Sequence, residues 1–184
     1  MSLLDEKEIE TLENLEILLS HWNVKYALIG AYALRALGYN VEKGKHTNVI
    51  VDIATLPWTV KEAKHEVFPP RDSVYLKDYF EFIEKGVSLH IIPYTSERFK
   101  KLSIVEYELP NKRKIKIGKP SDSVKMFAEE MKRYKIEEIG EYKIREWLDK
   151  IEYWKKVAEG HKDKEFAESC KQALLEVKTY FGFQ

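Results

Sequence analysis

The residues around Gly30 have the types and spacing that bind a phosphate group. The apolar run Tyr26–Ile29 predicts a buried strand, Gly30 allows a tight turn without a Cβ clash, and the run 31–37 predicts a short helix that ends at Gly38. A strand that enters a helix through glycine leaves backbone N–H groups pointing out of the turn, and such groups bind phosphates. The sequence therefore predicts an anion site built largely from backbone atoms.

The order of these features resembles the DNA polymerase beta-like nucleotidyltransferase superfamily. The signature of that family is a strand ending in Gly-Gly or Gly-Ser, a helix ending in glycine, an Arg-x-Thr, and then Asp-x-Asp on the next strand. Here Gly30-Ala31 stands at the Gly-Gly position and Lys45-His46-Thr47 at the Arg-x-Thr position. The resemblance implies an α/β (α+β) fold, in which a mixed β-sheet is flanked by helices and followed by a C-terminal helical region. Minimal and antitoxin-like nucleotidyltransferases are the branches it suggests.

A nucleotide site of this kind would draw on backbone and side chains from both predicted strands. Arg35 lies on the short helix, and Lys45 and Thr47 lead into the second strand, so all three could reach a phosphate or a ribose. A solvated surface position is the alternative for Arg35 and Lys45. The candidate nucleotide-binding residues are Gly30, Ala31, Arg35, Lys45 and Thr47.

The metal-binding carboxylates that the resemblance implies are absent from the sequence positions that match. The Asp-x-Asp position falls on Val49-Ile50-Val51, and His90 stands nearest to the position of the third carboxylate. Nucleotidyl transfer uses two divalent cations held by carboxylate oxygens, which valine cannot supply. The missing carboxylates therefore indicate a pseudoenzyme, for which no cofactor is assigned; Mg²⁺ is expected only if the chain is active.

The register of the second strand leaves an alternative open. Side chains alternate along a strand, so Val49 and Val51 share one face while Asn48 and Asp52 share the other. A slip or bulge of one residue would bring Asn48 and Asp52 to the site. Asp52 and His90 are then the candidate catalytic residues, able to hold one metal ion such as Mg²⁺. Otherwise Asp52 serves the turn that follows the strand, and His90 is an ordinary hydrogen-bonded strand histidine.

Composition limits the classes of partner and compartment. Lys and Arg number 31, as do Asp and Glu, so the net charge of zero argues against general nucleic-acid binding. A single cysteine, Cys170, cannot form an internal disulfide, which fits a reducing cytoplasm. No apolar run approaches the roughly 20 residues needed to span a membrane. Abundant Lys and Glu with few Gln residues is a balance typical of thermophiles.

Periodicity predicts the remaining elements. A helix over 4–22 is expected to begin with a capping box formed by Asp5 and Glu8, to bury its leucines and to expose its other glutamates, Glu16 included. The shorter elements that follow are predicted as a helix over 59–67, strands over 74–76, 79–83 and 87–92, a helical turn over 95–101, and strands over 104–109 and 114–117. Helical periodicity from Ser121 onward predicts a domain over 1–120 and a helical region over 121–184 packed on it.

Three functions fit these patterns. The first is a degenerate nucleotidyltransferase that binds a nucleotide or a protein partner through the old cleft without transferring nucleotides. The second is an active nucleotidyltransferase that uses shifted acidic residues and Mg²⁺. The third is an interaction protein that binds no nucleotide, with a homodimer formed through the C-terminal helices as one form.

Overall fold

The protein is described by a computed structural model that covers residues 1–57, 74–75 and 88–184. The chain divides into two compact units, Met1–Lys119 and Pro120–Gln184. The predicted helix over 59–67 and the predicted strand over 79–83 lie outside the described residues.

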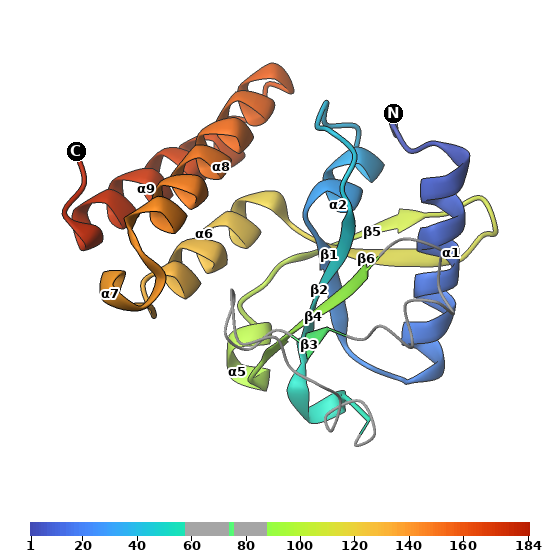
Figure 1. The fold of residues 1–184 in the computed structure, drawn as a ribbon. Coiled ribbons are helices and arrows are strands. Elements are labelled where there is room, and N and C mark those ends of the chain that lie inside the picture. The colour runs from blue at the N-terminus through green and yellow to red at the C-terminus, as the bar shows by residue number, and fades with distance from the viewer. Residues whose placement is uncertain (58–73, 76–87) are drawn as a thin grey trace. The chain divides into compact units, whose positions relative to one another are not determined.

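The first unit is built on a mixed β-sheet, as predicted (Figure 1). Among the described residues its six strands lie in the order β3-β4-β2-β1-β6-β5. Strand β1 is antiparallel to β2 and parallel to β6, while β2 is parallel to β4. The strands are β1 (Tyr26–Ile29), β2 (His46–Asp52), β3 (Val74–Tyr75), β4 (Ser88–Tyr94), β5 (Ile104–Glu108) and β6 (Lys114–Gly118). The helical segments are α1 (Glu6–His21), α2 (Ala31–Ala36), η1 (Ile53–Thr55) and α5 (Ser96–Phe99).

Helices α1 and α2 bury their apolar residues against one face of this sheet. The predicted capping box starts α1: the Asp5 carboxylate accepts a hydrogen bond from the Glu8 N–H, and the Asp5 N–H donates to the Glu8 carboxylate. The leucine stripe of α1 then packs with β1, β2, β4 and β6 in one cluster. Its fully buried members include Leu12, Leu15, Leu19, Leu28, Val49, Val51, Ile91, Ile115 and Ile117. This face of the sheet is the core face.

Two ion pairs, each with a buried glutamate of α1, fasten this helix to the rest of the unit. Glu8 binds Arg35 of α2 at 2.8 Å, and Glu16 binds Arg113 at 3.0 Å. The expectation that Glu16 is solvated is therefore wrong, because its side chain is 7% exposed. A carboxylate leaves water only when a partner compensates its charge, and Arg113 provides that compensation from the β5–β6 turn.

The second unit is helical, as the periodicity predicts. It contains α6 (Pro120–Met131), α7 (Ile136–Ile139), α8 (Glu141–Gly160) and α9 (Lys164–Phe181). Trp147 and Ile151 of α8 are buried with Phe166 and Cys170 of α9. Phe127 packs edge-on against Trp154, with ring centroids 5.4 Å apart. No helix in the described part of the chain has the length and apolar character needed to cross a membrane.

Replacing Arg35 with Met should destabilise the first unit. The change leaves the Glu8 carboxylate buried without its partner, which costs about 3 kcal/mol of unfolding free energy. Lys43→Met is the matched control, since Lys43 pairs with Asp5 at an exposed position and such pairs contribute less than about 1 kcal/mol. Chemical denaturation monitored by circular dichroism compares the two. Equal losses would contradict the role assigned to the Arg35 pair.

Cys170 should report unfolding of the second unit. Burial raises the pKa of its thiol to about 12, so almost no thiolate forms at neutral pH. We expect a thiol reagent at about pH 8 to label the native chain only after denaturant is added. Labelling at the rate of a free thiol in native buffer would contradict the packing of α9 described above.

Candidate functional site

The second face of the sheet carries the polar residues of the site. Paired residues on adjacent strands point to the same face, and Asn48 of β2 is paired with Ile29 of β1 on one side and His90 of β4 on the other. Along β2 the same face continues with Ile50 and Asp52. We call this surface the site face.

The register expected for β2 is wrong by one residue. Val49 and Val51 were expected at the ligand positions, but both are fully buried in the core cluster with Leu28 and Ile91. Asn48, not Val49, therefore lies beside the Gly30 turn. The alternative register is the one the strand adopts, without any bulge between β2 and its neighbours.

The Gly30 turn has a conformation that requires glycine. The φ of 83° and ψ of −158° at Gly30 lie in a backbone region that residues with a Cβ rarely adopt. Gly30 is also the N-cap of α2, and no side chain donates or accepts a capping hydrogen bond there. A Cβ at Gly30 would lie 3.3 Å from Asn48 Nδ2. The neighbouring loop is equally close, because a Cβ at Gly44 would lie 3.0 Å from the Ala31 Cβ. The turn thus lies close to Asn48 on one side and to Gly44 on the other.

Two histidines lie next to Asn48 on the site face. His46 and His90 stack with ring centroids 4.5 Å apart and an interplanar angle of 17°. His46 is exposed and His90 is half-buried. The sequence singles out His90 alone, and the stacked partner is visible only once β2 and β4 are paired. The alternation of polar residues along β2, at His46 and Asn48, could have indicated His46 as a residue of this face.

Asp52 stabilises the turn that follows β2, as the second of the two interpretations of this residue predicted. Its carboxylate accepts hydrogen bonds from the Ala54 N–H at 3.0 Å and from Ser96 Oγ at 2.7 Å, so that it caps η1 and ties α5 to β2. Asp52 lies four residues beyond Asn48, the register partner of His90, which places it roughly 13 Å away along the strand. Asp52 and His90 are therefore too far apart to hold one metal ion.

The other predicted ligand residues are dispersed. The Arg35 side chain is used in structural hydrogen bonds. Two of its N–H groups donate to the Glu8 carboxylate, one donates to the Leu3 carbonyl and one to the Val41 carbonyl. The Glu8 carboxylate raises the pKa of Arg35. Thr47 is buried on the core face, because it alternates with Asn48. Of the three predicted side chains, Lys45 alone is exposed in the loop beside the site face.

The site face suits an anion better than a hard cation. Across β1, β2 and β4 it offers an amide and two imidazoles, and these groups can donate hydrogen bonds to an anion. Within the described ranges no cluster of three or more His, Cys, Asp or Glu residues could hold a metal ion. The residues that the described part of the site face presents do not fit the pair of Mg²⁺ ions that the family resemblance implies.

Comparison with solved structures finds a distant likeness. A crystal structure of an antigenic nucleotidyltransferase-like protein from Paracoccidioides brasiliensis matches with a TM-score of 0.44 and 9% sequence identity. The match covers 97% of this chain and 78% of that chain. No protein-family model matches the sequence, and no curated protein sequence does so significantly. At this similarity no residue role is transferred to the present chain.

Substituting Gly30 tests how tightly the turn is constrained. Gly30→Ala should lower the unfolding free energy by about 2 kcal/mol, because alanine must adopt a strained backbone conformation and its methyl group meets Asn48. Gly160→Ala is the control: it lies at the end of α8 with no atom within 4 Å of the added Cβ, so the change should be neutral or mildly stabilising. Thermal unfolding of both variants measures the difference, and a neutral Gly30→Ala would refute the constraint.

Proposed function

We propose that this chain is a nucleotidyltransferase-type domain that binds a nucleotide on the site face and does not transfer nucleotidyl groups by a two-metal mechanism. The observation that carries the proposal is the set of residues beside Gly30. Where the family resemblance implies metal-binding carboxylates, β2 and β4 present Asn48, Ile50 and His90. The strand, turn, helix and strand that carry them are the arrangement the resemblance implies.

The loss of transfer follows from the chemistry of these side chains. Two-metal transfer needs carboxylates to hold the ions that activate the nucleophile and bridge the phosphates. The amide of Asn48 is a weak ligand for a divalent cation, and Ile50 is no ligand at all. Asp52 shares the face, but its Oδ1 accepts hydrogen bonds from the Ala54 N–H and from Ser96 Oγ, which gives the carboxylate a structural role. The carboxylates Asp72, Asp78 and Glu81 lie outside the described residues.

Retention of a nucleotide rests on groups that do not depend on the missing carboxylates. The Gly30 turn keeps its glycine conformation, and Asn48 beside it has both hydrogen-bond donors and an acceptor. Lys45 adds a positive charge at the loop next to β2. Together these groups match the sugar-phosphate part of a nucleotide, while the base remains unspecified.

Binding and transfer should separate experimentally. We expect the full chain to bind at least one nucleoside triphosphate in calorimetry and to pass no label from α-³²P nucleotides to itself, to RNA or to added protein. Asn48→Ala should weaken binding about tenfold, the effect of one lost hydrogen bond to a charged ligand. Asn40→Ala, at an exposed loop position, is the control and should bind like the wild type.

Asp52→Asn decides between the inactive and active interpretations. Asparagine retains an oxygen that can accept the Ala54 N–H, so the fold and nucleotide binding should persist. If the wild type transfers label and Asp52→Asn does not, the inactive interpretation is overturned. Failure of any nucleoside triphosphate to bind, with or without Mg²⁺, would overturn the nucleotide proposal and favour a protein-binding role.

A further inference from the structure

Strand β5 lies at one edge of the sheet, with only one side of its backbone paired (Figure 1). Among the described strands it pairs with β6 alone, over five consecutive residues without a bulge. Hydrogen bonds just beyond the two ends of this ladder show which residues face β6. At one end the Lys119 N–H donates to Ser103 O at 2.8 Å. At the other end the Leu109 N–H donates to Arg113 O at 2.8 Å. Since bonding alternates along an antiparallel strand, the odd-numbered residues of β5 are those that bond β6.

The even-numbered residues of β5 therefore direct their N–H and C=O groups away from the sheet. These residues are Ile104, Glu106 and Glu108. Consistent with this, the N–H of Lys116, the register partner of Glu106, donates to the Tyr26 hydroxyl on the other side of β6. No hydrogen bond to the outward groups of β5 is present in the part of the chain that the structure describes. Such a row of unpaired groups is a template for one more strand.

The side chains along this edge are accessible and lack the usual protection of an edge strand. Ile104 and Val105 are 39% and 38% exposed, although both are aliphatic. Edge strands are commonly protected by proline, by a bulge or by lysine, and β5 has none of the three. Because the two side chains alternate, they lie on opposite faces of the sheet. An added strand would cover apolar surface on both faces.

The charges on β5 favour a basic partner. Glu106 and Glu108 are exposed and lie on one face of the strand. Glu106 forms an ion pair with Lys114 at 3.8 Å in which both side chains are more than half exposed, and no ion pair of Glu108 is found among the described residues. Lysine or arginine opposite each glutamate would continue the alternation of charge that β6 and β5 begin. Opposite charges on adjacent strands stabilise strand pairing.

A second copy of β5 fits this edge less well. The antiparallel register that pairs all five residues places Glu106 opposite Glu106 of the other copy, and like charges directly opposite each other destabilise strand pairing. We propose that β5 is a docking edge for an extended, basic segment of a partner protein, which adds an antiparallel strand with lysine or arginine opposite Glu106 and Glu108. Strand β6 separates this edge from the three strands of the site face, so the two proposals are independent.

The test measures peptide binding to the full chain by fluorescence anisotropy. The probe is a labelled heptapeptide that alternates valine with lysine, and its counterpart alternates valine with glutamate. We expect the lysine peptide alone to bind saturably. N-methylation of its lysines should abolish binding, because their N–H groups face β5 in the antiparallel pair, whereas N-methylation of its valines should be tolerated. Equal effects of the two methylations, or failure of the lysine peptide to bind, would overturn the inference.

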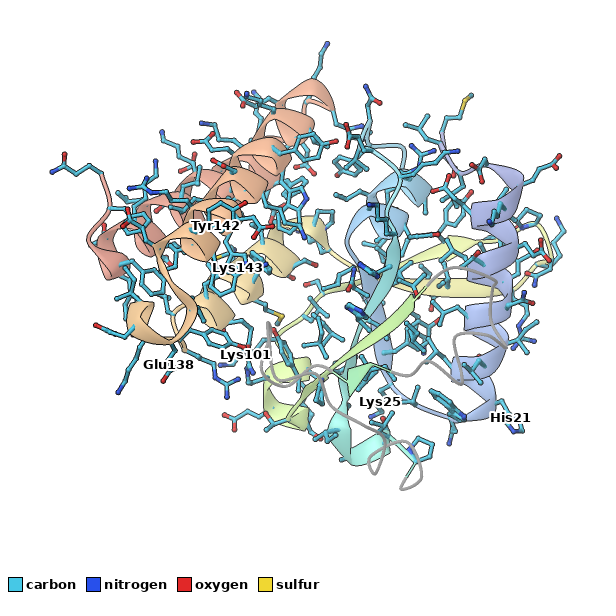
Figure 2. All side chains as sticks on the ribbon, in the orientation of Figure 1. His21, Lys25, Lys101, Glu138, Tyr142 and Lys143 are labelled. Atoms are coloured by element: carbon cyan, nitrogen blue, oxygen red, sulfur yellow. The ribbon has the colours of Figure 1, made fainter. Side chains whose placement is uncertain are left out.

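Reversing one charge on the protein tests the same contact. Glu108→Lys should weaken binding of the lysine peptide about fivefold and strengthen binding of the glutamate peptide. Glu159→Lys is the matched control, at an exposed position in the last turn of α8, the helix whose first turn carries Tyr142 and Lys143 in Figure 2. Lysine suits a helix C-terminus, so this variant should fold and bind like the wild type. Equal affinity of the two variants for the lysine peptide would contradict the docking edge.

Ile104→Pro tests the backbone contribution. The Ile104 N–H points outward at the first residue of β5, so proline removes a donor to the partner without breaking a hydrogen bond to β6. Thermal unfolding should be unchanged, and binding of the lysine peptide should fall severalfold; unchanged affinity would overturn the inference. Analytical ultracentrifugation tests the other occupant. A dimer of the full chain that Ile104→Pro dissociates would assign the edge to a second copy and overturn the basic partner.

Discussion

The burial of β2 side chains in the core cluster determines what the other side of the sheet can offer a ligand. Val49 and Val51 are fully buried on the core face, and moving both out of the core would cost about 2 kcal/mol for each side chain. Pairing with β1 and β4 fixes the same register from both sides. Asn48 and Ile50 are consequently forced onto the site face, so the chemistry there is set by core packing as much as by the polar residues themselves.

The Gly30 turn depends on contacts that have little to do with a ligand. Helix α2 is only six residues long, too short to be stable alone, so tertiary contacts must hold it. The Arg35–Glu8 pair ties its last turn to α1, and Tyr32, Ala33 and Ala36 bury its apolar side. An arginine that looked like a phosphate ligand therefore contributes to the site indirectly, by fixing the helix that follows the turn.

Local sequence patterns predicted the individual helices and strands. Features that depend on contacts between distant parts of the chain could not be predicted in the same way. The Asp5–Glu8 box, the β1 strand and the Gly30 turn are each encoded within a few residues, and all three were predicted. The register of β2 was not, because Val49, Ile50 and Val51 are all apolar and all buried, so their pattern does not say which face is the core. The Arg35–Glu8 pair and the His46–His90 stack join residues far apart in the chain, which no local pattern reveals.

Imidazoles in place of carboxylates would change what the fold can do with a phosphate. A histidine side chain can donate a hydrogen bond to a phosphate, which contributes to affinity. It cannot coordinate an incoming hydroxyl and lower its pKa as a bound divalent cation does. Ile50, which follows Asn48 on the site face, adds no polar group to compensate. Binding and catalysis therefore have separable requirements on this sheet, and under the proposed function the residues of β2 and β4 serve binding.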